Sequence, residues 1–206
     1  MRWKSFCISF FLLGVSLSSL LAEEILIYGH VPDFTFQERS GNSIKRSDFD
    51  GQAWISDFIF TRCQGMCPLM SGRMAVLQEE LGASGIKLVS FSVDPEYDTP
   101  QILSEYADRF KAKEGIWFFL TGEKQTMWNF IEEGFQLGVA KPSPEDLANG
   151  AEPVMHSNRF VLVDQKGQIR GYYDTSEPEK MKQLVRDALS LLRTARFLRE
   201  YFLGRT

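Results

Sequence analysis

The chain is poor in positive charge and has few of the residues that bind soft metals. Its 23 lysines and arginines are outnumbered by 27 aspartates and glutamates, and the net charge of −4 argues against a general nucleic-acid binder. It has no internal repeat and no low-complexity tract, which argues against a repeat protein. The 206 residues, with typical apolar and charged fractions, suit one domain of ordinary size after a targeting segment.

The N-terminus has the pattern of an export signal. Arg2 and Lys4 supply the positive end, and residues 6–21 are apolar with scattered serines. The apolar run of about 16 residues is slightly short for a membrane-spanning helix. We expect residues 1–22 to be a signal peptide or an N-terminal membrane anchor. Residues 23–206 then form one exported domain, periplasmic or anchored to the outer face of the cytoplasmic membrane.

Cysteine is scarce, and only Cys63 and Cys67 remain once the signal, with Cys7, is removed. Outside the cytoplasm, cysteines are commonly oxidised to structural disulfides. A pair four residues apart closes a very short loop, however, and constrains the unfolded chain little. A redox-active disulfide or a metal site is therefore favoured over a structural staple.

The hydrophobic pattern predicts an α/β fold around this pair. Strands alternate with helices, which predicts a largely parallel sheet with right-handed crossovers, and a final hairpin and helix are typical of a thioredoxin-like fold. The domain would add an N-terminal β extension and a C-terminal amphipathic helix. The expected strands are 33–38, 53–61, 86–93, 117–120, 159–164 and 168–173, and the helices are 68–81, 100–112, one capped by Thr121 and ending near 135, and 176–201, with a polar loop over 136–152.

The two thiols lie where a buried strand runs into a helix. Backbone N–H groups and the helix dipole favour a thiolate there. Two thiolates on one face of the helix can supply two ligands of a metal site. His156 is a candidate for the third ligand, because the loop before strand 159–164 lies beside that turn in a thioredoxin-like sheet. Two thiolates and one imidazole suit copper, whereas structural zinc usually has four protein ligands.

Three aspartates are candidates for tuning this site. Asp57 shares a strand face with Ile55 and Ile59, which predicts a carboxyl group in an apolar layer. Two interpretations stay open for it: a raised pKa and a proton-shuttle role in disulfide exchange, or a carboxylate satisfied by a nearby lysine or tryptophan N–H. Thr99 is expected to cap the helix that begins at 100. Asp94 and Asp98 are also expected to cap it and to order its loop, with tuning of the site as the sharper alternative.

Three segments resemble the SCO/SenC family in family order. They are Phe58-Ile59-Phe60-Thr61-Arg62-Cys63-Gln64-Gly65-Met66-Cys67-Pro68, Ser92-Val93-Asp94-Pro95-Glu96-Tyr97-Asp98-Thr99-Pro100, and His156 ahead of Phe160-Val161-Leu162-Val163-Asp164. The similarity covers roughly residues 28 to 192 and extends beyond the motifs on both sides. Each motif is moderately specific, and the three together are strongly so.

The resemblance implies a thioredoxin-like protein outside the cytoplasm that binds copper through Cys63, Cys67 and His156, and we expect it to be a monomer. It implies a role in assembling the CuA centre, with a cytochrome c oxidase subunit or another extracytoplasmic copper or thiol protein as partner. Thiol-disulfide reduction of a partner is also attributed to members. Many members have His where Arg62 stands and Asp where Met155 stands, which leaves copper delivery and thiol exchange both open.

Overall fold

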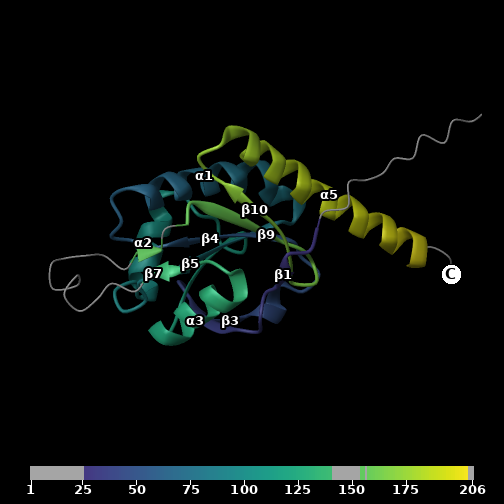
Figure 1. Ribbon diagram of the computed structural model, residues 1–206. Coiled ribbons are helices and arrows are strands. Elements are labelled where there is room, and N and C mark those ends of the chain that lie inside the picture. Colours follow the sequence, from purple (N-terminus) through teal and green to yellow (C-terminus); the bar gives the residue numbers. More distant parts are fainter. Residues whose placement is uncertain (1–25, 141–153, 156, 204–206) are drawn as a thin grey trace, which may run out of the picture.

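The computed structural model describes residues 26–140, 154–155 and 157–203 (Figure 1). The strands are β1 (Gly29–His30), β2 (Thr35–Glu38), β3 (Ser43–Lys45), β4 (Trp54–Ile59), β5 (Lys87–Ser92), β6 (Trp117–Thr121), β7 (Val139–Ala140), β8 (Val154–Met155), β9 (Arg159–Val163) and β10 (Gln168–Asp174). The α-helices are α1 (Met66–Leu81), α2 (Pro100–Arg109), α3 (Lys124–Phe135) and α5 (Pro178–Leu203). Among these described helices, none is long and apolar enough to span a membrane.

Eight of the described strands form one sheet in the order β1-β10-β9-β4-β5-β6-β2-β3. Only the β4–β5 and β5–β6 pairs are parallel, and the other neighbours are antiparallel. The expectation of a largely parallel sheet was therefore wrong, although the α/β class is confirmed. Helical crossovers make the centre parallel, whereas the β2–β3 and β9–β10 hairpins extend both edges with antiparallel strands.

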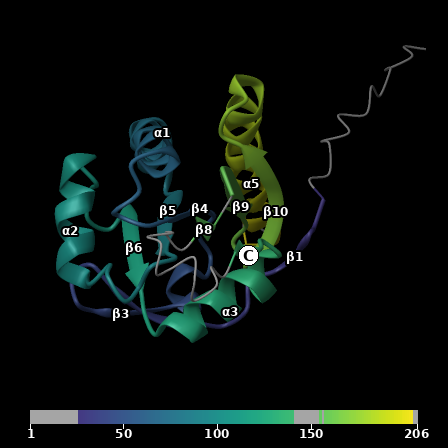
Figure 2. The same cartoon turned by 60° about the vertical axis from the view of Figure 1, so that its left-hand side comes forward.

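Helices cover both faces of this sheet. α1 and α5 lie on one face, and α3 lies on the opposite face (Figure 2). Strand alternation in β4 sends Trp54 and Phe58 to the α3 side, where both rings contact Phe135 with centroids 6.2 and 4.9 Å away. Asp57 therefore points to the α1 side. An aromatic cluster fills the α3 side: Phe34, Phe36, Trp54, Phe58, Phe91, Phe130 and Phe135.

Most predicted elements are present with shifted ends. The helix predicted over 68–81 begins at Met66 instead, so that it includes Cys67, and it ends at Leu81 as predicted. Thr121 was wrong as a helix cap, because it is the last residue of β6 and its buried hydroxyl has no partner among the described residues. Glu123 caps α3 instead, accepting hydrogen bonds from the N–H groups of Gln125 and Thr126.

The predicted loop over 136–152 is only partly described. Its first part contains β7, which pairs with β8 through Val139 opposite Met155 and Ala140 opposite Val154. Residues 141–153 lie outside the described residues. The short β7–β8 ladder ties the chain just before residue 156 to the end of α3.

Candidate thiol and metal site

Cys63 and Cys67 lie at the junction between β4 and α1. The N–H of Cys63 donates to the carbonyl of Phe60 at 3.2 Å, which turns the chain out of the sheet. Cys67 is the second residue of α1, and its N–H donates to Cys63 Sγ at 3.5 Å. Both thiols are free. A backbone donor aimed at Cys63 Sγ from a helix N-terminus stabilises negative charge on that sulfur.

The two thiols differ in exposure. Cys63 is half-buried, whereas Cys67 is 6% exposed and packs in the core. Burial raises the pKa of the Cys67 thiol far above its ordinary value, against a smaller lowering by the backbone of Phe60. Cys63 is therefore the sulfur that a partner reaches first, and Cys67 stays protonated until Cys63 or a metal engages it.

Asp57 is fully buried beneath this junction. Its Oδ1 accepts a 2.5 Å hydrogen bond from Ser90 Oγ, and Ser90 Oγ accepts one from Trp117 Nε1 at 2.9 Å. Oδ2 has no hydrogen-bond partner among the described residues. Burial raises the pKa of Asp57 to about 7, only partly offset by the Ser90 hydrogen bond. Within the described residues, the Cys67 thiol and the Tyr106 hydroxyl lie close enough for the Asp57 charge to raise their pKa values.

Asp98 holds the turn that leads to Cys63. Its carboxylate is fully buried and accepts from the Thr61 hydroxyl at 2.5 Å, from the Thr61 N–H at 3.3 Å and from the Ser92 hydroxyl at 2.6 Å. Burial raises its pKa, against the lowering effect of these hydrogen bonds. Asp98 thus joins the loop after β5 to the segment after β4.

Asp94 holds the residue next to the thiol. Its Oδ2 accepts from Arg62 Nη2 at 2.5 Å and from Arg62 Nε at 3.0 Å. The same guanidinium lies over the Tyr97 ring, 4.5 Å from its centroid. Thr99, rather than either aspartate, is the N-cap of α2. The capping expectation for Asp94 and Asp98 was therefore wrong, because both carboxylates reach across to the β4–α1 turn instead.

His156 lies outside the described residues. The backbone on its C-terminal side is described: β9 pairs antiparallel with β4, with Trp54 opposite Val163 and Ser56 opposite Val161. This register places the start of β9 at the sheet end from which the thiol turn leaves. Among the residues that the structure describes, no cluster of three or more His, Cys, Asp or Glu side chains is arranged to hold a metal.

Several residues that shape the site were missed by sequence reasoning. Ser90 stands directly across from Asp57 in the parallel β4–β5 register, so a serine within a buried strand pattern was the available signal. Ser92 and Thr61 complete the shell around Asp98. Their role needs two segments more than thirty residues apart to be neighbours, and no local pattern reports that.

A dithiol at a strand-to-helix junction, on this sheet order, defines a thioredoxin-like thiol protein. The chain belongs to the SCO1/SenC family, whose family model matches residues 28–192. The SCO1 protein homolog of Bacillus subtilis (strain 168) is 35% identical over 163 residues, covering 78% of this chain and 81% of that protein.

Solved structures agree with this assignment. A SCO1/SenC family lipoprotein from Bacillus anthracis str. Ames has TM-score 0.70 and 32% identity, covering 79% of this chain and 95% of that one. BsSco, described as a cytochrome c oxidase assembly protein with a disulfide switch, has TM-score 0.69 and 31% identity, covering 82% and 96%. Yeast Sco1 with copper bound matches at 21% identity and TM-score 0.66, covering 80% and 89%, which shows a shared fold alone.

The buried Asp57 carboxyl predicts a pH-dependent stability. Because its pKa rises from 3.8 to about 7 on folding, the native state binds the proton more tightly, and stability falls as pH rises through this interval. The Asp57→Asn variant lacks this loss. It should be more stable than the wild type at pH 8, by up to about 4 kcal/mol, and nearly equal to it at pH 4.

Urea denaturation of the reduced proteins between pH 4 and 8 measures this difference. Asp108→Asn, at an exposed position on α2, is the control and should follow the wild-type pH dependence. If the free energies of unfolding of the wild type and Asp57→Asn changed in parallel between pH 4 and 8, the raised pKa assigned to Asp57 would be contradicted.

Proposed function

We propose that this protein binds one copper ion through Cys63, Cys67 and His156 and delivers it to the CuA centre of cytochrome c oxidase. The observation that carries the proposal is the β4–β9 register. This register supports the view that the chain segment leading into β9 lies at the same end of the sheet as both thiols. A histidine three residues before Arg159 is within the reach of that end by chain length.

The donor chemistry supports copper. Two thiolates and an imidazole are soft and borderline ligands that suit Cu(I) and Cu(II). Because only three protein ligands hold the ion, a partner ligand can enter its coordination shell and take it over. Family membership and a relative from Stutzerimonas stutzeri named as a copper-binding protein support the same choice. We further propose that the protein functions outside the cytoplasm, with residues 1–22 as export signal or anchor. A relative that is a lipoprotein supports this location.

Asp94 and Asp98 are proposed to tune the site. Asp98 fixes Thr61, and Asp94 fixes Arg62, so the two residues before Cys63 are both held by buried carboxylates. The Arg62–Asp94 pair also partly neutralises the positive charge nearest Cys63. Side chains that orient metal ligands in this way alter metal affinity without touching the metal.

A second function, thiol-disulfide exchange with a partner, is favoured by the unequal burial of the two sulfurs. Cys63 is half-buried with a backbone N–H donor, and Cys67 is buried with a raised pKa. This is the arrangement of an attacking thiol and a resolving thiol. We propose Asp57, also buried and coupled to Cys67, as the group that takes the Cys67 proton.

The exchange would run in two steps. The Cys63 thiolate attacks a partner disulfide, forms a mixed disulfide and releases one partner thiolate. Cys67 then loses its proton and attacks Cys63 Sγ, which releases the second partner thiolate and leaves a Cys63–Cys67 disulfide. The partner gains two electrons. The oxidised protein cannot bind copper through these sulfurs until it is reduced.

Copper titration of the reduced protein tests the ligand set. We expect one tightly bound copper per monomer, with affinity reduced more than about 100-fold in His156→Ala, because losing a ligand exceeds the effect of losing an outer partner. His30→Ala is the matched control, since His30 lies exposed in β1, and should bind like the wild type. Unaltered copper affinity in His156→Ala would contradict the three-ligand site.

Trapping tests the exchange reaction. A Cys67→Ser variant offered a disulfide-bonded CuA domain should accumulate a mixed disulfide through Cys63, because no resolving thiol remains. Cys63→Ser should form none. The adduct is read by non-reducing electrophoresis and mass spectrometry. Its absence from Cys67→Ser would remove the exchange function, and an unchanged pH profile of exchange in Asp57→Asn would remove the proton role of Asp57.

Asp94 contacts Arg62 rather than a proposed copper ligand, so replacing it should alter copper affinity indirectly. Asp94→Asn removes a full negative charge beside the Arg62 guanidinium, and copper affinity should change by about tenfold, the low end for outer partners. The control is Glu96→Gln in the same loop, which removes an exposed Lys124–Glu96 ion pair instead. Equal copper affinities in the two variants would argue against tuning by Asp94.

A further inference from the structure

One side of α1 is apolar and open to solvent from the thiol end of the helix onward. Met66, Leu69 and Val76 are 42%, 60% and 64% exposed. Steps of three and seven residues put these side chains on one stripe of a helix. The stripe begins at the residue before Cys67, so anything bound along it reaches the thiols at one end.

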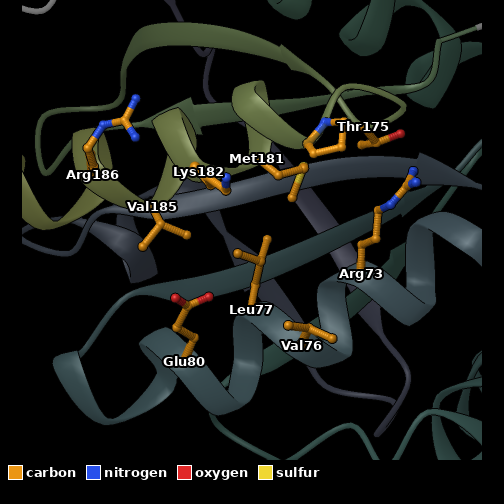
Figure 3. Close-up of a pocket in the computed structure, with 10 residues that line it drawn as sticks. Arg73, Val76, Leu77, Glu80, Thr175, Met181, Lys182, Val185 and Arg186 are labelled. Atoms are coloured by element: carbon orange, nitrogen blue, oxygen red, sulfur yellow. The ribbon is translucent and has the colours of Figure 1, made fainter.

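The stripe leads into a groove between α1 and α5. The groove has a volume of about 480 Å³, with Val76 and Leu77 from α1 facing Met181 and Val185 from α5 (Figure 3). Leu77 is buried, whereas Val76 is open to solvent. Val76 is therefore the part of the apolar lining of α1 that a partner can reach from outside.

The rim of the groove is mainly cationic. Arg73, Lys182 and Arg186 line it, and Glu80 is the acidic residue among the lining side chains. Lys182 is paired with Glu179 at 2.8 Å, while Arg73 makes no ion pair within the described part of the chain. A positive rim on a chain with a net charge of −4 is a local departure from the overall charge. It favours a ligand with acidic groups beside apolar ones.

We propose that the α1–α5 groove and the α1 stripe form the docking surface for an acidic, apolar segment of the protein that exchanges copper or electrons with the thiols. The inference rests on the proposed function and adds the site and chemistry of the partner contact. Apolar side chains of that segment fill the groove, and its carboxylates meet Arg73 and Arg186. The segment then lies along α1 with its near end over Cys63 and Cys67.

Charge argues against a second copy of this chain as the occupant. A two-fold dimer brings the same patch from each subunit together, so Arg73 and Arg186 of one copy would face cations of the other. An acidic partner segment meets no such repulsion.

Binding of the copper-loaded protein to the soluble CuA domain of cytochrome c oxidase tests the surface. We expect Val76→Asp and the double variant Arg73→Glu/Arg186→Glu each to weaken binding by about tenfold or more. Arg73→Lys should bind nearly like the wild type. Lys45→Glu, an exposed charge reversal on β3 at the far edge of the sheet, should change binding less than about twofold.

Copper affinity of each variant, measured without the CuA domain, should stay at the wild-type value and separates docking from metal binding. Wild-type binding should also weaken as salt rises, and the double variant should lose most of that dependence. Three results would overturn the proposal. The groove variants could bind the CuA domain like the wild type, or the wild type could bind copper but not the CuA domain. Sedimentation could also show a dimer that Val76→Asp dissociates.

Discussion

The buried Asp98 carboxylate is the constraint on which the site depends. It receives hydrogen bonds from Thr61 at the exit of β4 and from Ser92 at the end of β5. These bonds lock the turn that carries Cys63 to the loop after the neighbouring strand. Removing the carboxylate would leave the buried Ser92 hydroxyl without its acceptor, at a cost of about 1–3 kcal/mol. The thiol positions follow from this lock together with the start of α1.

Burial then gives the two sulfurs different chemistry. Cys67 enters the core as the second residue of α1, above the buried Asp57, and both groups have raised pKa values because low-dielectric surroundings disfavour their charged forms. Cys63 remains within reach of solvent. The same arrangement serves copper binding, where the ion itself displaces the protons, and disulfide exchange, where a base must take them.

The proposed docking surface uses the same helix. α1 presents Cys67 to the site from its first turn, and its buried side packs on the sheet. Its outer side carries Leu69 on the exposed stripe and Val76 at the groove with α5. One rigid element thus connects the chemistry to the surface that a partner would contact. Its orientation depends on packing in the core, to which Leu77 of the groove also contributes.

The sequence by itself determined the fold class, the strand-to-helix setting of Cys63 and Cys67 and the inward face of Asp57, because these depend on local hydrophobic period and motif. Tertiary structure decided the rest. The antiparallel edges of the sheet, the Glu123 cap of α3 and the reach of Asp94 and Asp98 to Arg62 and Thr61 all depend on which segments become neighbours. A carboxylate beside a helix start looks like a cap in sequence, and only the folded chain shows a stronger partner more than thirty residues away.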